Sequence, residues 1–323
     1  MINNFFRLYY LLRFGGWTYV WVGIVNKVFG HESARKLLYK KTNKIKPQKY
    51  ETELAKIYAL KTGKKLDLKN PRTFNEKIQW LKLYDATYLK TQLTDKYLVR
   101  EWIKEKIGEQ YLIPLLGVWD KFEDIDIESL ADSFVLKANH GSEWNVVVHD
   151  KKVVDWEKVQ KKFNEWISLN FAFIAGFQMQ YLNISPKIIA EEYIKSENGS
   201  LYDYKIHCFN GNPEYIHLIG DRKINAHQAK EAFYSTEWEL LPFISGVYSQ
   251  YETEQKKPDH LEEMLQISRK LSQDFIYVRV DLYELDSGEI KFGEMTFTPG
   301  SGFYQWSPPD TDKLWGSKLS LPL

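Results

Sequence analysis

The texture of the chain changes at residue 111, and this change constrains the fold more than any other feature. Before that point apolar residues recur at helical spacing, which predicts helices at His31–Leu38, Tyr50–Thr62, Thr73–Tyr84 and Thr94–Ile107. After it, short apolar runs bounded by turn residues predict strands at Tyr111–Leu116, Phe134–Ala138, Asn145–Val148, Ile188–Ile194, Tyr204–Phe209, Tyr215–Leu218, Ile276–Tyr283 and Ile290–Phe292. Further helices at Trp156–Asn170 and His260–Phe275 separate these strands. The pattern predicts an α+β protein with a helical N-terminal part.

Local signals mark several ends of these elements. Thr73 is followed three residues later by Glu76, the pattern of a capping box at a helix start. Thr94 is expected to cap the fourth helix, with Asp95 in its positive first turn. Turn residues at 210–211 and 286–288 predict two β-hairpins.

The charge balance and the single cysteine exclude several classes of protein. Lys and Arg number 44 against 43 Asp and Glu, so no basic excess exists to neutralise the phosphates of a nucleic acid partner. Cys208 alone cannot form an internal disulfide or a zinc site of several thiolates. We therefore expect a cytoplasmic protein, with two closely packed domains in its 323 residues. The 15% aromatic content favours a large aromatic core over sugar-stacking surfaces.

The first 29 residues leave two interpretations open. The uncharged stretch from Gly15 to Asn26 is 12 residues long, whereas a membrane-spanning helix needs roughly 20. Aromatic residues together with Arg7 and Arg13 would suit a helix lying at a membrane interface, on the inner face of the membrane. The alternative is a helix packed on the domain.

A charged pair interrupts the last predicted hairpin. Arg279 and Asp281 are two residues apart in a strand of Val, Leu and Tyr, so their side chains point to the same face. Glu294 follows 13 residues after Asp281, across the hairpin turn, and can reach that face. Two carboxylates and a guanidinium would suit Mg²⁺ and a phosphate. A surface cluster of salt bridges is the alternative.

A lysine and a small turn lie together earlier in the chain. Lys137 is followed closely by Gly141 and Ser142, so a point charge and backbone N–H donors could serve a phosphate. The segment is not a Walker A sequence, and a lysine at a strand end can equally be solvated.

Two acids interrupt the strand predicted at 188–194. Glu191 and Glu192 are adjacent and point to opposite faces, so at most one faces inward. Such a segment can act as a hinge that meets a nucleotide. Lys205 opens the next strand, in which His207 is expected to be a packed residue rather than a ligand.

The loop after the last strand is rich in hydroxyls and glycine. Thr298 and Ser301 lie in it, and its backbone N–H groups could face a substrate oxyanion. An ordinary polar loop is the alternative. Trp306 follows and could stack on an acceptor sugar or close the core beneath the loop.

The order of these residues resembles that of the ATP-grasp superfamily. Within it, the run from Asn70 to Asp85, followed by Thr94-Asp95-Lys96, is similar to the TupA-like ATP-grasp family, and the resemblance covers about residues 50–320. That family is associated with making cell-surface polysaccharides and teichuronopeptides. The resemblance implies an ATP-grasp fold, in which two α+β subdomains sandwich ATP. It divides the chain into an N-terminal helical or interfacial segment (1–49), a helical part (50–110) and the ATP-grasp subdomains (111–323).

The resemblance also implies roles for the residues named above. Lys96 and Lys137 would hold the nucleotide phosphates, and Arg279 would stabilise the transferring phosphoryl group and the tetrahedral intermediate. The remaining implied positions are Gly141 and Ser142 in the mobile phosphate loop, Glu191 or Glu192 at the nucleotide hinge, Lys205 as a looser ATP contact, and Asp281 and Glu294 as Mg²⁺ ligands. The sequence departs from the family at Thr296, where ATP-grasp ligases commonly place an asparagine as a third metal contact.

The implied activity is an ATP-dependent ligation of a carboxylate and an amine through an acyl-phosphate. The expected substrates are a uronic acid of a surface glycan and an amino acid or amino sugar. Two other classes remain. One is a glycosyltransferase, which usually needs an Asp-x-Asp motif; that motif occurs only at Asp124–Asp126. The other is a non-catalytic scaffold of a polysaccharide-assembly complex.

Overall fold

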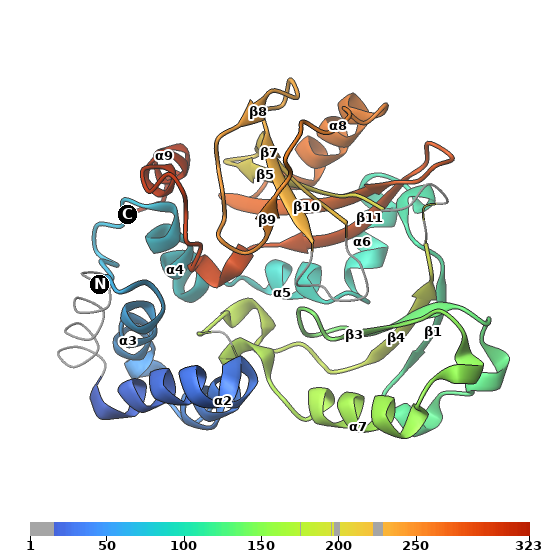
Figure 1. Ribbon diagram of the computed structural model, residues 1–323, viewed down its shortest axis with the longest axis horizontal. Coiled ribbons are helices and arrows are strands. Elements are labelled where there is room, and N and C mark those ends of the chain that lie inside the picture. Colours follow the sequence, from blue (N-terminus) through green and yellow to red (C-terminus); the bar gives the residue numbers. More distant parts are fainter. Residues whose placement is uncertain (1–15, 175, 195, 197–200, 222–228) are drawn as a thin grey trace.

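The computed structural model describes residues 16–174, 176–194, 196, 201–221 and 229–323 (Figure 1). Its N-terminal part is helical, with α2 (Gly16–Thr42), α3 (Tyr50–Thr62), α4 (Phe74–Tyr84), α5 (Tyr88–Thr94) and α6 (Val99–Lys106). The predicted capping box at α4 is confirmed, since the Thr73 hydroxyl accepts from the Glu76 N–H and the Glu76 carboxylate accepts from the Thr73 N–H. The predicted helix at 31–38 is the last part of the longer α2.

The prediction of one helix from Thr94 to Ile107 is wrong. Thr94 ends α5, and α6 begins at Val99. Between them the Asp95 carboxylate accepts from the backbone N–H groups of Tyr97 and Leu98, at 2.8 and 3.2 Å, and from the Asn139 amide at 2.9 Å. A contact with a distant segment therefore stabilises a turn where the local sequence indicated a helix start.

The predicted membrane-interface segment falls largely outside the described residues, because residues 1–15 are not among them. Within the described ranges, no helix has the length and hydropathy of a membrane span. On α2, Trp21, Ile24 and Val28 are exposed at helical spacing. The interfacial interpretation stays a prediction, as does the division of the chain at residues 49 and 110.

The first sheet has the order β1-β4-β2-β3, with every neighbouring pair antiparallel. Its strands are β1 (Leu115–Trp119), β2 (Phe134–Ala138), β3 (Asn145–Val148) and β4 (Ile188–Glu192). Strand β1 lies a few residues later than predicted, because Glu109–Tyr111 forms a short 3₁₀ turn. Helix α7 (Trp156–Ile167) packs on this sheet through Val159 and Phe163.

The second sheet has the order β11-β10-β5-β6-β7-β8, with the short β9 pairing to β7. Its strands are β5 (Asp203–Phe209), β6 (Asn212–Gly220), β7 (Lys230–Tyr234), β8 (Leu240–Leu241), β9 (Ser249–Gln250), β10 (Tyr277–Glu284) and β11 (Ile290–Thr296). The hairpin predicted at 210–211 is confirmed, and Asn210 and Gly211 both take the positive φ that a tight hairpin turn requires. Strands β7, β8 and β9, and helix α9 (Thr311–Lys318), were not predicted.

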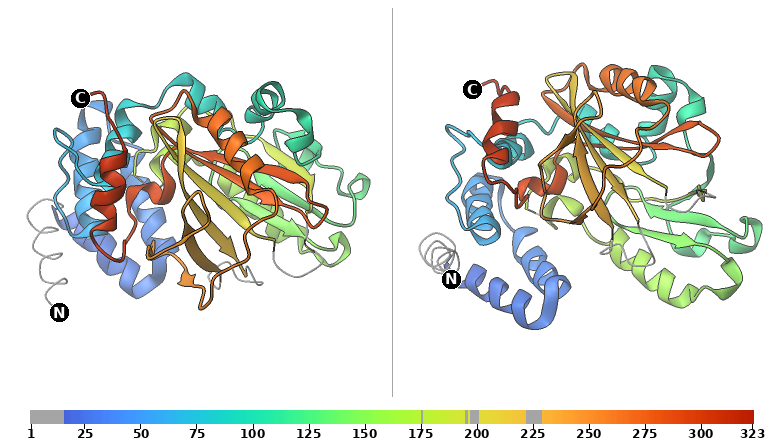
Figure 2. Two further views of the ribbon diagram at one scale, coloured as in Figure 1. Left: turned by 90° about the horizontal axis from the view of Figure 1, so that it is seen from above. Right: turned by 45° about the horizontal axis from the view of Figure 1, so that its top comes forward.

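The two faces of the second sheet differ in chemistry. One face carries apolar residues such as Ile206, Val278 and Val280, which pack on α8 (Leu261–Ser272). The other carries charged residues toward the β11 edge and an aromatic cluster around Phe74 and Trp315, to which α4 and α9 contribute. Figure 2 shows α9 beside the N-terminal helices, far from it in sequence. The charged part of this face is the candidate site.

Candidate active site

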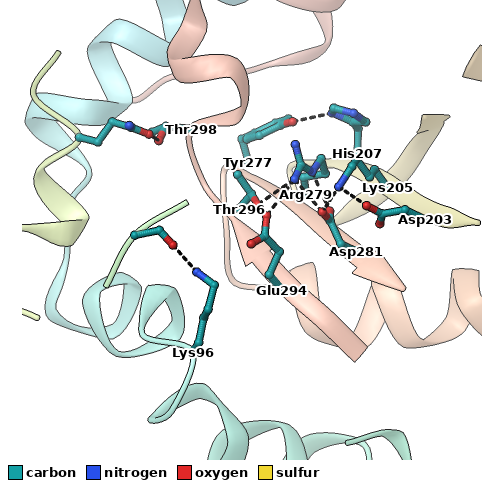
Figure 3. A network of polar contacts seen from close by, with 12 residues as sticks. Lys96, Asp203, Lys205, His207, Tyr277, Arg279, Asp281, Glu294, Thr296 and Thr298 are labelled. Atoms are coloured by element: carbon teal, nitrogen blue, oxygen red, sulfur yellow. Dashed lines mark hydrogen bonds and ion pairs between the residues drawn. The ribbon is translucent and has the colours of Figure 1, made fainter. Parts of the chain in front are cut away.

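Arg279 is the centre of a buried network on β10 and β11 (Figure 3). Its Nε and Nη2 donate to the two carboxylate oxygens of Asp281, each at 2.6 Å. Nη2 also donates to Glu294 at 3.0 Å and to the Thr296 hydroxyl at 3.1 Å. The hairpin thus brings together the three charged residues that the sequence predicted to share a face, and Thr296 with them.

A β-bulge at Gly293 places Glu294 on this face. From Glu284 to Leu282 the pairing is regular, with Leu282 opposite Phe292. Continued without interruption, that register would set Asp281 opposite Gly293 and turn Glu294 toward the apolar face. The bulge instead pairs Asp281 with Glu294. A Cβ at position 293 would lie 3.1 Å from the backbone oxygen of Asp281, so a glycine suits the bulge.

Lys205 on β5 joins the network from the neighbouring strand. Its ammonium lies 2.5 Å from an Asp281 carboxylate oxygen and 2.7 Å from Asp203. Lys205 pairs directly with Asp281 in the β5–β10 ladder, so the two side chains share a face. Asp203 was missed from the sequence, although its spacing of two residues from Lys205 was a usable signal.

The charges around Glu294 keep its carboxylate ionised. Burial would raise the pKa of Glu294, but attraction to Lys96, Arg279 and Lys205 outweighs it and lowers the pKa to about 2. Burial raises the pKa of Asp281, and the adjoining Arg279 and Lys205 oppose this effect. Glu294 and Asp281 both offer carboxylate oxygens, which are hard donors of the kind that Mg²⁺ prefers. In the described ranges, no group of three or more His, Cys, Asp or Glu side chains could hold a metal ion on its own. A carboxylate pair still suits Mg²⁺ carried by a nucleotide, because phosphate oxygens and water complete its coordination.

Lys96 lies in the turn between α5 and α6 and reaches the β2–β3 turn. Its ammonium donates to the Gly141 carbonyl at 2.5 Å. Burial lowers the pKa of Lys96, while the negative charge of Glu294 raises it, so the two groups are within electrostatic reach. Lys96 thus contacts Gly141 and lies on the side of the hairpin network that carries Glu294 (Figure 3). Ser142 follows Gly141 and is half-buried.

The Trp144 ring leaves no room for a side chain at position 141, which is why a glycine is found there. A Cβ there would lie 2.2 Å from the Trp144 ring, which stacks on Trp166 at 6.1 Å. Any side chain at position 141 would therefore displace the Trp144 ring or the turn itself.

Lys137 and Glu191 form a second ion pair on the first sheet. The Lys137 ammonium lies 2.5 Å from one Glu191 oxygen, and Arg100 of α6 donates to the other at 2.8 Å. Glu192 is exposed, so the prediction that at most one of the two acids faces inward is confirmed. Arg100 was missed from the sequence, because nothing local distinguishes it from other charged residues of its helix.

The loop after β11 has scaffold contacts of its own. Thr298 is buried, donates to Gln178 at 2.5 Å and accepts from Gln180 at 2.7 Å. The Ser301 carbonyl accepts from Gln79 of α4 at 3.1 Å. Neither residue contacts the Arg279 network through any of these bonds, and their role at a substrate stays a prediction.

Trp306 lies in the aromatic cluster and not on a sugar-binding surface. It is 7% exposed, and its ring packs on Trp315 and Tyr304 with centroid distances of 4.6 and 4.9 Å. A sugar could not reach the faces of this indole, so the stacking interpretation is replaced by the packing one.

Trp306→Ala is therefore expected to lower the free energy of unfolding by about 3 to 5 kcal/mol, as truncation of a buried aromatic does. Chemical denaturation measures it. Trp21→Ala is the matched control, since Trp21 is 57% exposed on α2 and its loss should change stability by less than about 1 kcal/mol. Equal stability of Trp306→Ala and the wild type would contradict the packing role.

Comparison with models of protein families identifies the family of the chain. The family model described as TupA-like ATPgrasp matches residues 76–320. The structure is similar to an L-amino acid ligase from Bacillus licheniformis, with 15% identity and a TM-score of 0.43, over 71% of this chain and 49% of that one. It is also similar to the D-alanine-D-alanine ligase from Coxiella burnetii, with 13% identity and a TM-score of 0.39, over 76% of this chain and 60% of that one. The chain spans about half the length of the solved structures it matches. No curated protein matches the sequence significantly.

Proposed function

The chain belongs to the TupA-like ATP-grasp family and has an ATP-grasp fold, and we propose that it is an ATP-dependent carboxylate–amine ligase. The observation that carries the proposal is the buried network of Arg279, Asp281, Glu294 and Lys205 on one face of the second sheet. A surface cluster of salt bridges would be solvated, whereas Asp281 is 2% exposed and Arg279 8%. Buried charges on this scale suit a functional site.

The proposed roles follow from where each group lies. Asp281 and Glu294 would hold Mg²⁺, which when bound neutralises charge on the phosphates of ATP. Lys96 and the turn at 141–142 would lie against the phosphates, because Lys96 contacts that turn and interacts electrostatically with Glu294. Lys137, on the first sheet, would contact the nucleotide phosphates from that side. Glu191 is buried beside Lys137, so we prefer it to the exposed Glu192 as the acid at the nucleotide hinge. Thr296 offers only a neutral hydroxyl oxygen, so it is the weakest of the proposed metal contacts.

The proposed reaction has two steps. A carboxylate oxygen of the acceptor attacks the γ-phosphorus of ATP, the bond to the leaving phosphate oxygen breaks, and an acyl-phosphate and ADP result. The amine nitrogen then attacks the acyl carbon, and inorganic phosphate leaves. Arg279 would stabilise the charge that develops in both steps.

The proposed substrates rest on the association of the family with surface polysaccharides. They are a carboxylated sugar or glycan, for which a uronic acid is the simplest model, and an amino acid or amino sugar. We place the reaction in the cytoplasm, with the inner face of the membrane as the natural position for a lipid-linked acceptor.

Hydroxylamine tests the proposed function, because it traps an acyl-phosphate as a hydroxamate. We expect ADP release that depends on a carboxylate, tested with glucuronate and galacturonate, and hydroxamate when hydroxylamine replaces the amine. Sugar transfer from a nucleotide sugar without ATP consumption would instead establish a glycosyltransferase, and absence of ATP binding would indicate a scaffold. The glycosyltransferase is the less favoured, because Asp124 and Asp126 are exposed and lie outside both sheets.

A further inference from the structure

Two buried histidines extend the charged face of the second sheet beyond the carboxylate pair. His207 on β5 pairs with Arg279, and His217 on β6 pairs with Lys205, so both rings share the face of the network. The two rings stack with centroids 6.1 Å apart. The proposed roles of the network use neither histidine.

Each imidazole has one nitrogen in a contact and one without a partner. His217 Nε2 lies 2.9 Å from a Glu231 carboxylate oxygen, and His207 Nδ1 lies 2.6 Å from the Tyr277 hydroxyl (Figure 3 shows the second pair). His217 Nδ1 and His207 Nε2 are buried and contact no hydrogen-bonding group in the described part of the chain. Buried nitrogens of this kind are rare in folded proteins and call for a partner that the chain does not supply.

Glu231 determines which nitrogen of His217 carries the proton. This carboxylate is completely buried and accepts from the Ser245 N–H at 2.8 Å and from the Ser245 hydroxyl at 2.5 Å. No lysine or arginine of the described residues contacts it. Since Glu231 accepts from Ser245 through both of its oxygens, we assign it as the acceptor from His217 too, so His217 donates through Nε2–H and Nδ1 keeps a free lone pair.

We propose that His217 is the base that deprotonates the amine substrate and that Glu231 is its positioning residue. This inference rests on the proposed ligase function. A primary amine arrives as an ammonium ion, which is not a nucleophile. One N–H bond of the ammonium breaks, the proton moves to His217 Nδ1, and the freed electron pair of the nitrogen attacks the acyl carbon. The bond from the acyl carbon to the phosphate oxygen then breaks, and the second proton of the amine leaves with the phosphate as hydrogen phosphate. The resulting imidazolium is paired with Glu231, which lacks any other cation partner among the described residues.

The surroundings of His217 suit this role. Glu231 on β7, Lys205 and His207 on β5, and Arg279 on β10 are the charged or titratable groups that face it. Burial lowers the pKa of His217, the adjoining Glu231 raises it, and the positive charges of Lys205 and Arg279 lower it further. Together these effects lower the pKa of His217, so the ring is neutral and Nδ1 keeps its lone pair.

His217→Gln separates the two halves of the reaction, because the Gln amide can still donate to Glu231 but cannot accept a proton. Hydroxylamine is unprotonated at neutral pH and needs no base. We expect the variant to form hydroxamate from glucuronate at the wild-type rate, and to lose at least about a hundredfold in amide formation with glycine or glucosamine. His260→Gln is the matched control, since His260 and Glu284 form the same kind of pair away from the site. A thermal melt and an ATP titration confirm that each variant is folded.

The outcomes distinguish this inference from the proposed function. No hydroxamate with the wild type would overturn both. Hydroxamate with the wild type but equal amide formation by His217→Gln would overturn the inference alone. So would hydroxamate without any amide from either amine in the wild type, or loss of both products in a folded His217→Gln.

Glu231→Gln gives a second measurement that a purely structural role would not move. Without the carboxylate the imidazolium loses its partner, so the acidic limb of the pH profile for amide formation should shift to lower pH and the plateau should fall. The pH profile for hydroxamate formation should stay where it is. An unshifted amide profile in a folded Glu231→Gln variant would remove Glu231 from the assignment.

Discussion

Glu294→Gln is expected to remove Mg²⁺-dependent turnover by more than about a hundredfold while leaving the protein folded. A neutral amide cannot balance the charge of a bound ion, and a metal acting as Lewis acid contributes several kcal/mol to the transition state. The fold should survive because Glu294 is one-third exposed at its side chain and contacts Arg279 and Thr296 at the rim of the network. ADP release at a series of Mg²⁺ concentrations measures the effect.

Asp281→Asn should lose activity to the same extent and stability as well. Asp281 holds both Arg279 and Lys205 in a buried position, and removing one partner of a buried pair costs about 3 to 5 kcal/mol. Glu289→Gln is the control for both variants, because Glu289 lies on the same hairpin with its side chain 60% exposed. A loss below about tenfold in Glu294→Gln, or its unfolding, would favour a structural salt-bridge cluster over a metal site.

The shared face of Arg279 and Asp281 could be predicted because strand periodicity is a local property of two neighbouring positions. The position of Glu294 could not be derived so simply. An odd spacing of 13 residues reaches the same face only because the bulge at Gly293 adds one residue to β11. The glycine in an otherwise regular strand was the available signal for that bulge.

Residue patterns could not predict contacts between residues that the fold brings together from different elements. Arg100 contacts Glu191, which lies 91 residues further along the chain. Glu231 contacts His217 over 14 residues, from a strand that was not predicted. His207 was expected to be an ordinary packed residue, and its burial agrees, but its unpartnered nitrogen appears only in three dimensions. The Thr94 cap failed for the same reason, since Asn139 contributes to a turn that the local sequence cannot reveal.

The family resemblance supplied what periodicity could not. Lys96 lies in a turn where helical spacing predicted a helix, and its contact with Gly141 depends on the packing of two separate parts of the chain. The match over residues 76–320 accounts for the fold of both sheets. The family assignment does not predict which residues contact the acceptor, because members of one family can bind different substrates through different side chains.

Arg279→Lys is expected to lower turnover by about a hundredfold or more even though the positive charge is kept. The guanidinium donates to Asp281 through two nitrogens and also reaches Glu294 and Thr296. A lysine ammonium is a point charge on a flexible stem and cannot reproduce this planar fork, so both carboxylates would lose their fixed positions. Arginines that stabilise phosphoryl transfer contribute about 10³ to 10⁵ in rate, and a substitution that keeps the charge should lose part of that.

The Mg²⁺ dependence of the Arg279→Lys variant distinguishes the two roles proposed for Arg279, which are holding the carboxylates and stabilising the transferring phosphoryl group. If it only held the carboxylates, Arg279→Lys would raise the Mg²⁺ concentration needed for activity, and saturating Mg²⁺ would restore the rate. If it also stabilises the transferring phosphoryl group, the maximal rate of ADP release stays low at saturating Mg²⁺ and ATP. We expect the second result, because the hydrogen bonds of the guanidinium use Nε and Nη2, and Nη1 has no hydrogen-bond partner in the described part of the chain. Arg269→Lys on the exposed side of α8 is the control, and full recovery by Mg²⁺ in Arg279→Lys would reduce Arg279 to a positioning residue.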